Sequence, residues 1–274
     1  MVQTHVLEKG ITMPNRRVGF GLERVRGIII SCKNAIGRWG SDHIEIQAAL
    51  ADLKQYMDLH NEENYSLPQD VKSGIEELLA YYVPVDDNCF TISAKEYFKK
   101  QPDFKEFAYS RHSVRWFDDK PVETNLILKA VELAQTAPSA CNRQATRVNI
   151  ISSDEKKRLC CTLQNGNRGF GDRADKWLLI TSELSDWPCD QTDIALIDAG
   201  IFIMNLLYSL HYYGIVACTL NAHFDKEKQR ALLKGLGIPE SEIPVAFVVI
   251  GNPTDKFMVP KSRRLIVEDI TKII

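Results

Sequence analysis

The stretch of this sequence that says most about its fold reads Arg-His-Ser-Val-Arg at residues 111–115. It is a short basic cluster with a serine hydroxyl, and a second such cluster, Lys-Ser-Arg, stands at residues 261–263. Two cationic side chains and a hydroxyl suit a phosphate monoester, because its oxygens accept charge-assisted hydrogen bonds. A basic cluster taken alone is usually solvated surface. The order and spacing of the motifs therefore carry the interpretation.

A polar loop lies between the two basic clusters and reads Pro-Ser-Ala-Cys-Asn-Arg-Gln at residues 138–144. Its hydroxyl and amide groups could contact the edge of a planar heterocycle. The loop follows a predicted helix over about residues 123–137. Pro138 ends that helix, because the residue before a proline avoids the helical conformation.

A second polar loop, residues 164–171, is rich in asparagine and glycine. Its glycines follow a GxxGxG order after a helix, whereas a dinucleotide-binding loop has GxGxxG and opens a helix, so we exclude a Rossmann motif. Asn165 and Asn167 have two interpretations. Their amides either pair with the edge of a bound ring or belong to an ordinary Asn/Gly turn.

Predicted strands and helices alternate around these loops. Strands are predicted at about residues 147–152, 177–182, 215–220 and 245–251, and helices at about residues 154–164, 193–213 and 225–235. Such alternation favours an α/β or α+β fold with helices on both sides of a sheet. The last strand is continuously apolar, which is typical of a strand covered on both faces.

The three motifs, in this order, resemble those of the FMN-dependent nitroreductase family. The resemblance runs from about Phe104 to the C-terminus. It implies a three-layer αβα sandwich with a mixed central sheet over residues 104–274, and an N-terminal helical extension over residues 1–103. That extension is similar to those of family members associated with polysaccharide biosynthesis.

The resemblance also implies an FMN site in which the protein supplies no catalytic residue, because the flavin carries the chemistry. Arg111, Lys261 and Arg263 would bind the phosphate, and Ser113 would add a hydroxyl. Arg115 would approach the ring or the ribityl chain. The implied cofactor-binding residues are Arg111, His112, Ser113, Arg115, Pro138, Ser139, Asn142, Gln144, Asn165, Asn167, Thr219, Leu220, Lys261 and Arg263.

The loop at residues 138–144 would reach the flavin of a second subunit, so the resemblance implies a homodimer with a shared flavin site. One departure from the family pattern lies at this loop, where Ala145 and Thr146 replace the usual proline after Gln144.

The implied activity is ping-pong electron transfer from NADH or NADPH, through FMN, to a small-molecule acceptor. Nitro compounds, quinones and a sugar-linked substrate are all possible acceptors. Two alternatives remain open. One is another flavin reaction of the same superfamily, such as that of a dehydrogenase or a dehalogenase. The other is a module that binds a flavin or phosphate ligand without turnover.

The composition limits the classes of partner and the cellular compartment that we expect for this protein. The formal net charge is −2, which gives no case for a nucleic-acid or anionic-membrane partner. The N-terminus shows no signal peptide. The apolar stretch at residues 194–213 contains Asp198, Asn205 and His211, so we expect a buried helix and not a membrane span. Seven cysteines without a CxxC pair fit the reducing cytoplasm, and the histidines show no metal-binding spacing.

In the N-terminal region we expect two amphipathic helices, one over about residues 42–60 and one beginning after Pro68. Their apolar faces exceed what a lone helical hairpin can bury, so they are predicted to pack on the core or on a partner subunit. Glycines cluster over residues 10–40, so the sequence does not decide whether this segment forms regular structure.

Overall fold

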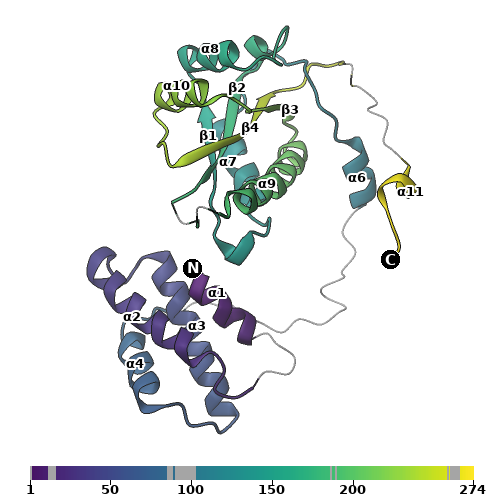
Figure 1. Cartoon of the computed structure of the whole chain (residues 1–274). Coiled ribbons are helices and arrows are strands. Elements are labelled where there is room, and N and C mark those ends of the chain that lie inside the picture. Colours follow the sequence, from purple (N-terminus) through teal and green to yellow (C-terminus); the bar gives the residue numbers. More distant parts are fainter. Residues whose placement is uncertain are drawn as a thin grey trace. The chain divides into compact units, whose positions relative to one another are not determined.

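The computed structural model describes residues 2–11, 17–84, 89, 103–185, 187–188, 190–257, 259 and 266–274 (Figure 1). The chain divides into two compact units. The first comprises Met1–Lys100 and Cys141–Arg143, and the second comprises Gln101–Ala140 and Gln144–Ile274.

The first unit is helical and has its own core. Its described helices are α1 (Val2–Ile11), α2 (Leu22–Trp39), α3 (Ile44–Glu62) and α4 (Gln69–Leu79). Fully or almost fully buried side chains from all four helices form one cluster, which includes Leu7, Val25, Ile28, Leu50, Leu53, Tyr56, Val71 and Ile75. The two predicted helices are confirmed as α3 and α4. The prediction that their apolar faces need another domain was wrong, because α1 and α2 cover them.

The structure decides what the sequence left open over residues 10–40. Most of this segment is the 18-residue helix α2. Gly21 precedes the helix with φ 64° and Gly40 follows it with φ 81°, so these two glycines take up backbone conformations that other residues adopt only with strain. They mark the ends of the helix.

A buried histidine ties the turn before α2 to α3. The His60 side chain is completely buried, and its Nε2 accepts a hydrogen bond from the backbone N–H of Gly19 at 3.0 Å. The neighbouring Tyr56 hydroxyl donates to the carbonyl of Phe20 at 2.6 Å, and burial raises the pKa of Tyr56 to about 12. These bonds satisfy backbone groups that would otherwise be buried without partners.

The second unit is built on a four-stranded sheet with the order β1-β2-β4-β3. Its strands are β1 (Thr146–Ile151), β2 (Lys176–Glu183), β3 (Val216–Asn221) and β4 (Glu242–Gly251). The described ladders are all antiparallel, with a register shift in β2 at Ile180/Thr181. The expected mixed sheet therefore needs correction. Alternation of strands and helices predicts layers, but it does not reveal strand direction.

Helices cover both faces of this sheet (Figure 1). Helices α8 (Asp154–Leu163) and α10 (Lys226–Leu236) pack on the face that presents Trp177, Leu179 and Phe247. Helices α7 (Thr124–Ala134) and α9 (Thr192–Tyr212) pack on the opposite face, which presents the alternate residues Leu178, Ile180 and Val248. This alternation produces three layers, and it confirms the predicted αβα architecture.

Shorter elements complete the described part of the second unit. Helix α6 (Phe104–Ser110) packs on α9, where the rings of Phe104 and Phe107 lie 5.6 and 5.8 Å from Tyr208. The other short elements of this unit are η2 (Gly171–Arg173) and α11 (Val267–Ile270), whereas η1 (Ala140–Asn142) combines Ala140 of this unit with two residues of the first.

Among the described residues, α9 is the one helix long and apolar enough to cross a membrane, with 21 residues and a mean hydropathy of 1.6. It contributes Ile203, Leu206 and Leu210 to the core beneath the sheet. A core helix passes the same test of length and composition, so these two properties alone do not distinguish the two kinds of helix.

Candidate functional site

The first basic cluster runs beside the edge strand β3. The backbone N–H of Val114 donates to the carbonyl of Ala217 at 2.9 Å, and the Val114 side chain is buried. This bond fixes the segment from Arg111 to Arg115 against the strand that carries Thr219 and Leu220. Two of the predicted groups of site residues therefore meet here.

Arg115 also reaches the loop at residues 164–171. Its guanidinium lies 5.6 Å from the centre of the Phe170 ring, in a cation–π contact. Burial raises the pKa of the Cys218 thiol, and the charge of Arg115 partly offsets that shift. The same loop is tied to β3, because Gln164 Nε2 donates to the carbonyl of Asn221 at 3.3 Å. The basic cluster, the loop and β3 thus form one neighbourhood.

A small cationic cavity of about 110 Å³ opens beside this cluster. Arg111 and His112 line it together with Ser110 and with His211 from the last turn of α9. Burial lowers the pKa of His211, and the charges of Arg111 and His112 lower it further. An anion in this cavity would relieve that repulsion, so the arrangement favours binding of a negatively charged group.

His211 was not among the site residues predicted from the sequence. The sequence shows it only as a polar interruption of an apolar helix. The structure adds that Ser110 Oγ lies 2.7 Å from His211 Nε2 and that the Phe107 ring lies 5.0 Å from the imidazole. These contacts join residues about 100 positions apart, so they could not be predicted from the spacing of residues in the sequence.

The second basic cluster lies outside the described residues, so the structure does not place Lys261 or Arg263. The described residues that come shortly before it in the chain, Phe257 and Val259, line the 110 Å³ cavity. Ser113 is partly buried in the segment beside β3.

Within the loop at residues 164–171, the two asparagines differ. Asn165 is exposed, whereas Asn167 is 8% exposed. The Asn167 side-chain amide donates to the carbonyl of Cys161 at 3.0 Å and to the carbonyl of Gln164. Cys161 lies in the last turn of α8, where carbonyl groups lack helical partners. Asn167 therefore caps α8, and this arrangement favours the turn interpretation for its side chain.

The loop at residues 138–144 has an unusual backbone. Cys141, Asn142 and Gln144 all have positive φ angles, of 53°, 51° and 52°. Such conformations are uncommon for residues other than glycine. Ser139 Oγ accepts a hydrogen bond from the backbone N–H of Gln144 at 3.1 Å, and the buried Asp198 carboxylate accepts one from Ala140 at 2.8 Å.

Pro138, Ser139 and Gln144 line a cavity of about 280 Å³ with Asp198 of α9. His211 follows Asp198 by thirteen positions on α9, and at 1.5 Å per residue this corresponds to about 20 Å along the helix. Among the described residues, Arg111 and His112 therefore line one cavity beside α9, and Pro138, Ser139 and Gln144 line another.

No cluster of three metal-ligating side chains is found in the described part of the chain. Five of the cysteines described there are free thiols: Cys32, Cys141, Cys160, Cys161 and Cys218.

Comparison with known proteins agrees with this architecture. The sequence pattern of the Nitroreductase family matches residues 108–160. A "Putative NADH dehydrogenase/NAD(P)H nitroreductase" of Archaeoglobus fulgidus is 27% identical over 149 residues, which cover 54% of this chain and 84% of the relative. An "FMN reductase [NAD(P)H]" of Bacillus subtilis is 24% identical over 160 residues, which cover 53% of this chain and 63% of the relative.

The fold is shared with a solved structure from Parabacteroides distasonis, described as a "Putative NADH dehydrogenase/NAD(P)H nitroreductase", at a TM-score of 0.54 and 20% identity. The alignment covers 61% of this chain and 95% of the solved one. The three-layer unit thus has a nitroreductase-like fold, and residues 108–160 are similar to the Nitroreductase family.

Proposed function

We propose that residues 104–274 form an FMN-dependent oxidoreductase domain that passes electrons from NAD(P)H to a small-molecule acceptor. The observation that carries the proposal is the meeting of the Arg111–Arg115 segment, the 164–171 loop and β3 beside a cationic cavity. The Bacillus subtilis relative is named as an FMN reductase that uses NAD(P)H, which supports both cofactors.

The donor set at the cavity fits a flavin phosphate. A volume of about 110 Å³ admits a phosphate group, and Arg111 supplies a fixed positive charge. His211, whose pKa is lowered by burial and by the neighbouring charges, adds a group that gains a proton as an anion approaches. In our proposal Lys261 and Arg263 complete this charge, and Ser113 donates a hydroxyl hydrogen bond.

The reacting ring would lie beyond the phosphate, along β3. Bound FMN supplies two-electron transfer between NAD(P)H and the acceptor. Arg115, held over Phe170, would stabilise the negative charge of the reduced ring. The backbone of Thr219 and Leu220, on the edge strand, would contact the ring edge, and Asn165 would present its exposed amide to it.

A second copy of the chain would complete the site. The exposed face of α9 carries Ile197 and Ile201, which are 60% and 43% exposed, an apolar surface that a dimer would bury. The loop that carries Pro138, Ser139 and Gln144 lines a cavity with Asp198, about 20 Å along α9 from His211. We propose that it contacts the flavin of the partner subunit. The free thiols support a reducing cytoplasm as its location.

Flavin titration of the purified protein tests the phosphate site. We expect Arg111→Ala to weaken FMN binding about tenfold or more, because a charge-assisted hydrogen bond is lost. Arg230→Ala is the matched control, since Arg230 is an exposed arginine of α10 on the opposite face of the sheet. Unchanged FMN affinity in Arg111→Ala would remove this assignment.

Anaerobic reduction tests turnover. We expect NADH or NADPH to bleach the yellow flavin, and a panel of nitro compounds, quinones and sugar-linked substrates to restore its colour. Flavin that binds but is not bleached by either donor would favour the binding module without turnover. Bleaching without reoxidation by any member of the panel would favour another flavin reaction of the superfamily.

A further inference from the structure

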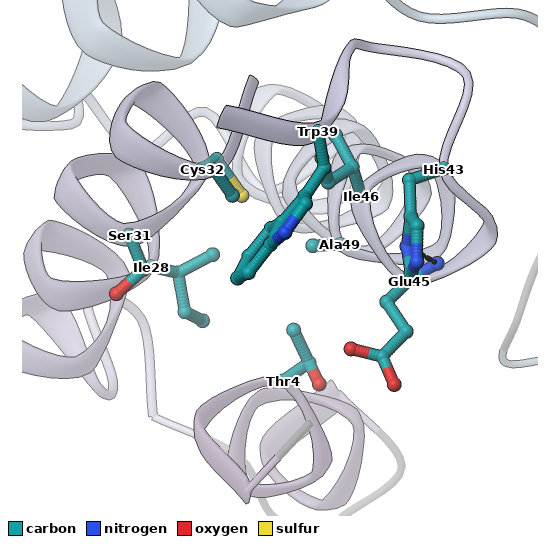
Figure 2. Close-up of a pocket in the computed structure, with 10 residues that line it drawn as sticks. Thr4, Ile28, Ser31, Cys32, Trp39, His43, Glu45, Ile46 and Ala49 are labelled. Atoms are coloured by element: carbon teal, nitrogen blue, oxygen red, sulfur yellow. Dashed lines mark hydrogen bonds between the residues drawn. The ribbon is translucent and has the colours of Figure 1, made fainter. Parts of the chain in front are cut away.

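The N-terminal unit contains a cavity of its own, of about 300 Å³ (Figure 2). Helices α1, α2 and α3 form its walls. The described lining residues are Thr4, Ile28, Ser31, Cys32, Ala35, Trp39, His43, Glu45, Ile46 and Ala49. This volume lies within the range of cavities that bind small molecules, and the lining is mostly apolar with a few polar groups, as in such sites.

The sequence leaves this space open by placing small side chains along the helices. On α2, residues 28, 31, 32, 35 and 39 follow the three- and four-residue spacing of one helix face. Ser31 and Ala35 on this face, and Ala49 on α3, are too small to fill the gap that larger residues would close. Elsewhere in the same hydrophobic cluster, Val25 and Leu50 are completely buried.

A large aromatic side chain stands at the mouth of the cavity. Trp39 is 62% exposed, an unusual state for a side chain whose apolar surface normally becomes buried. The Arg38 guanidinium lies 5.3 Å from the ring centre. Figure 2 shows the indole extending across the cavity, between Ile28 on one side and Glu45 on the other. The ring thus offers a flat apolar surface to a molecule in the cavity.

The polar side of the cavity is negatively charged. Figure 2 shows the Glu45 carboxylate extending toward Thr4, opposite the apolar wall formed by Ile28. Neither lysine nor arginine is among the described lining residues. Burial raises the pKa of Cys32, so this thiol is neutral and belongs to the apolar wall. A ligand with a positive charge near Glu45 and an apolar body against Trp39 matches this distribution.

We propose that this cavity of the N-terminal unit is a binding site for a small organic amine with an aromatic or similarly flat apolar body. Its ammonium group pairs with Glu45 and its ring packs between Trp39 and Ile28. The cavity shares no described lining residue with the two cavities assigned to the proposed flavin site.

Calorimetric titration of the full chain with three probes of one shape tests the proposal. The probes are 3-phenylpropylamine, 3-phenylpropanol and 3-phenylpropionate, which are positive, neutral and negative at pH 7. We expect the amine to bind with a dissociation constant of about 1 mM or below, as is usual for ligands of this size. The alcohol should bind about tenfold more weakly, and the acid should not bind measurably.

Three variants test which features of the cavity are responsible for amine binding. Glu45→Gln keeps the size of the exposed side chain and should lower amine affinity to that of the alcohol. Ala35→Leu should abolish binding of all probes by filling the cavity. Glu62→Gln removes an exposed charge at the other end of α3 and should change nothing.

Equal binding of the three probes, or no binding by any, would overturn the proposal. So would an amine preference that survives Glu45→Gln, or binding that survives Ala35→Leu. FMN affinity, measured in the same proteins, should be equal in all three variants, so failure of this site and failure of the flavin site are distinguishable.

Discussion

Replacing Asn167 with alanine separates a structural from a flavin-binding role for this side chain. The amide donates to Cys161 O at 3.0 Å and to Gln164 O, and both bonds close the C-terminus of α8. A net contribution of about 1 kcal/mol for each hydrogen bond gives a loss of about 2 kcal/mol. For a domain of this size the melting temperature should fall by roughly 4–8 °C, at about 2–4 °C per kcal/mol.

The assay is thermal unfolding of the flavin-free protein, followed by circular dichroism. Asn165→Ala is the matched control, because Asn165 is the exposed asparagine of the same loop, and its melting temperature should change by less than about 1 °C. If Asn167→Ala melts like the unmodified protein when flavin-free but loses FMN affinity, the capping role is refuted. The amide would then act on the flavin ring.

Three further expectations follow from the second unit. Light scattering should give about twice the 31.1 kDa chain mass, and Ile197→Glu, on the exposed face of α9, should produce monomers. An unmodified protein that is monomeric and still binds FMN tightly would contradict the shared site. Deletion of residues 1–102 should leave a folded domain that still binds FMN. A folded domain without flavin would show that the extension builds the site. Burial and the charges of Arg111 and His112 lower the pKa of His211, so the folded state resists protonation of this imidazole and the free energy of unfolding should fall as the pH drops below about 6.5. Urea unfolding at several pH values measures this fall, and His211→Gln should make it smaller.

The core elements of the second unit could be predicted because their signals are local. Ser153 and Asp225 cap α8 and α10 by accepting hydrogen bonds from backbone N–H groups three residues further on. Strand β4 is apolar at almost every position because helices cover both sheet faces. Strand direction could not be predicted, since it depends on pairing between distant segments.

The N-terminal unit shows how a composition signal can mislead. Glycine usually weakens a helix, so a glycine-rich segment predicts loops. Here Gly21 and Gly40 lie at the ends of α2, and Val25, Ile28, Ile29 and Cys32 form an uninterrupted buried face between them. Burial of that face against α3 and α4 outweighs the cost of the glycines inside the helix. The position of a glycine relative to the apolar face matters more than the number of glycines.

Helix α9 explains why the site could be recognised only in part. The Arg-His-Ser-Val-Arg and Pro-Ser-Ala-Cys-Asn-Arg-Gln motifs are contiguous, so the sequence displays them directly. The residues that orient them are single polar positions on an otherwise apolar helix. Asp198 accepts a hydrogen bond from the second motif, and His211 contacts Ser110 just before the first. In the sequence, Asp198 and His211 stand out only as polar residues within an apolar helix. In the fold, α9 packs against the sheet and also contacts the segments that hold both motifs. Its length sets the distance of about 20 Å between them. A homodimer that pairs the Arg111 end of one α9 with the Ser139 end of another would turn that distance into a single flavin site.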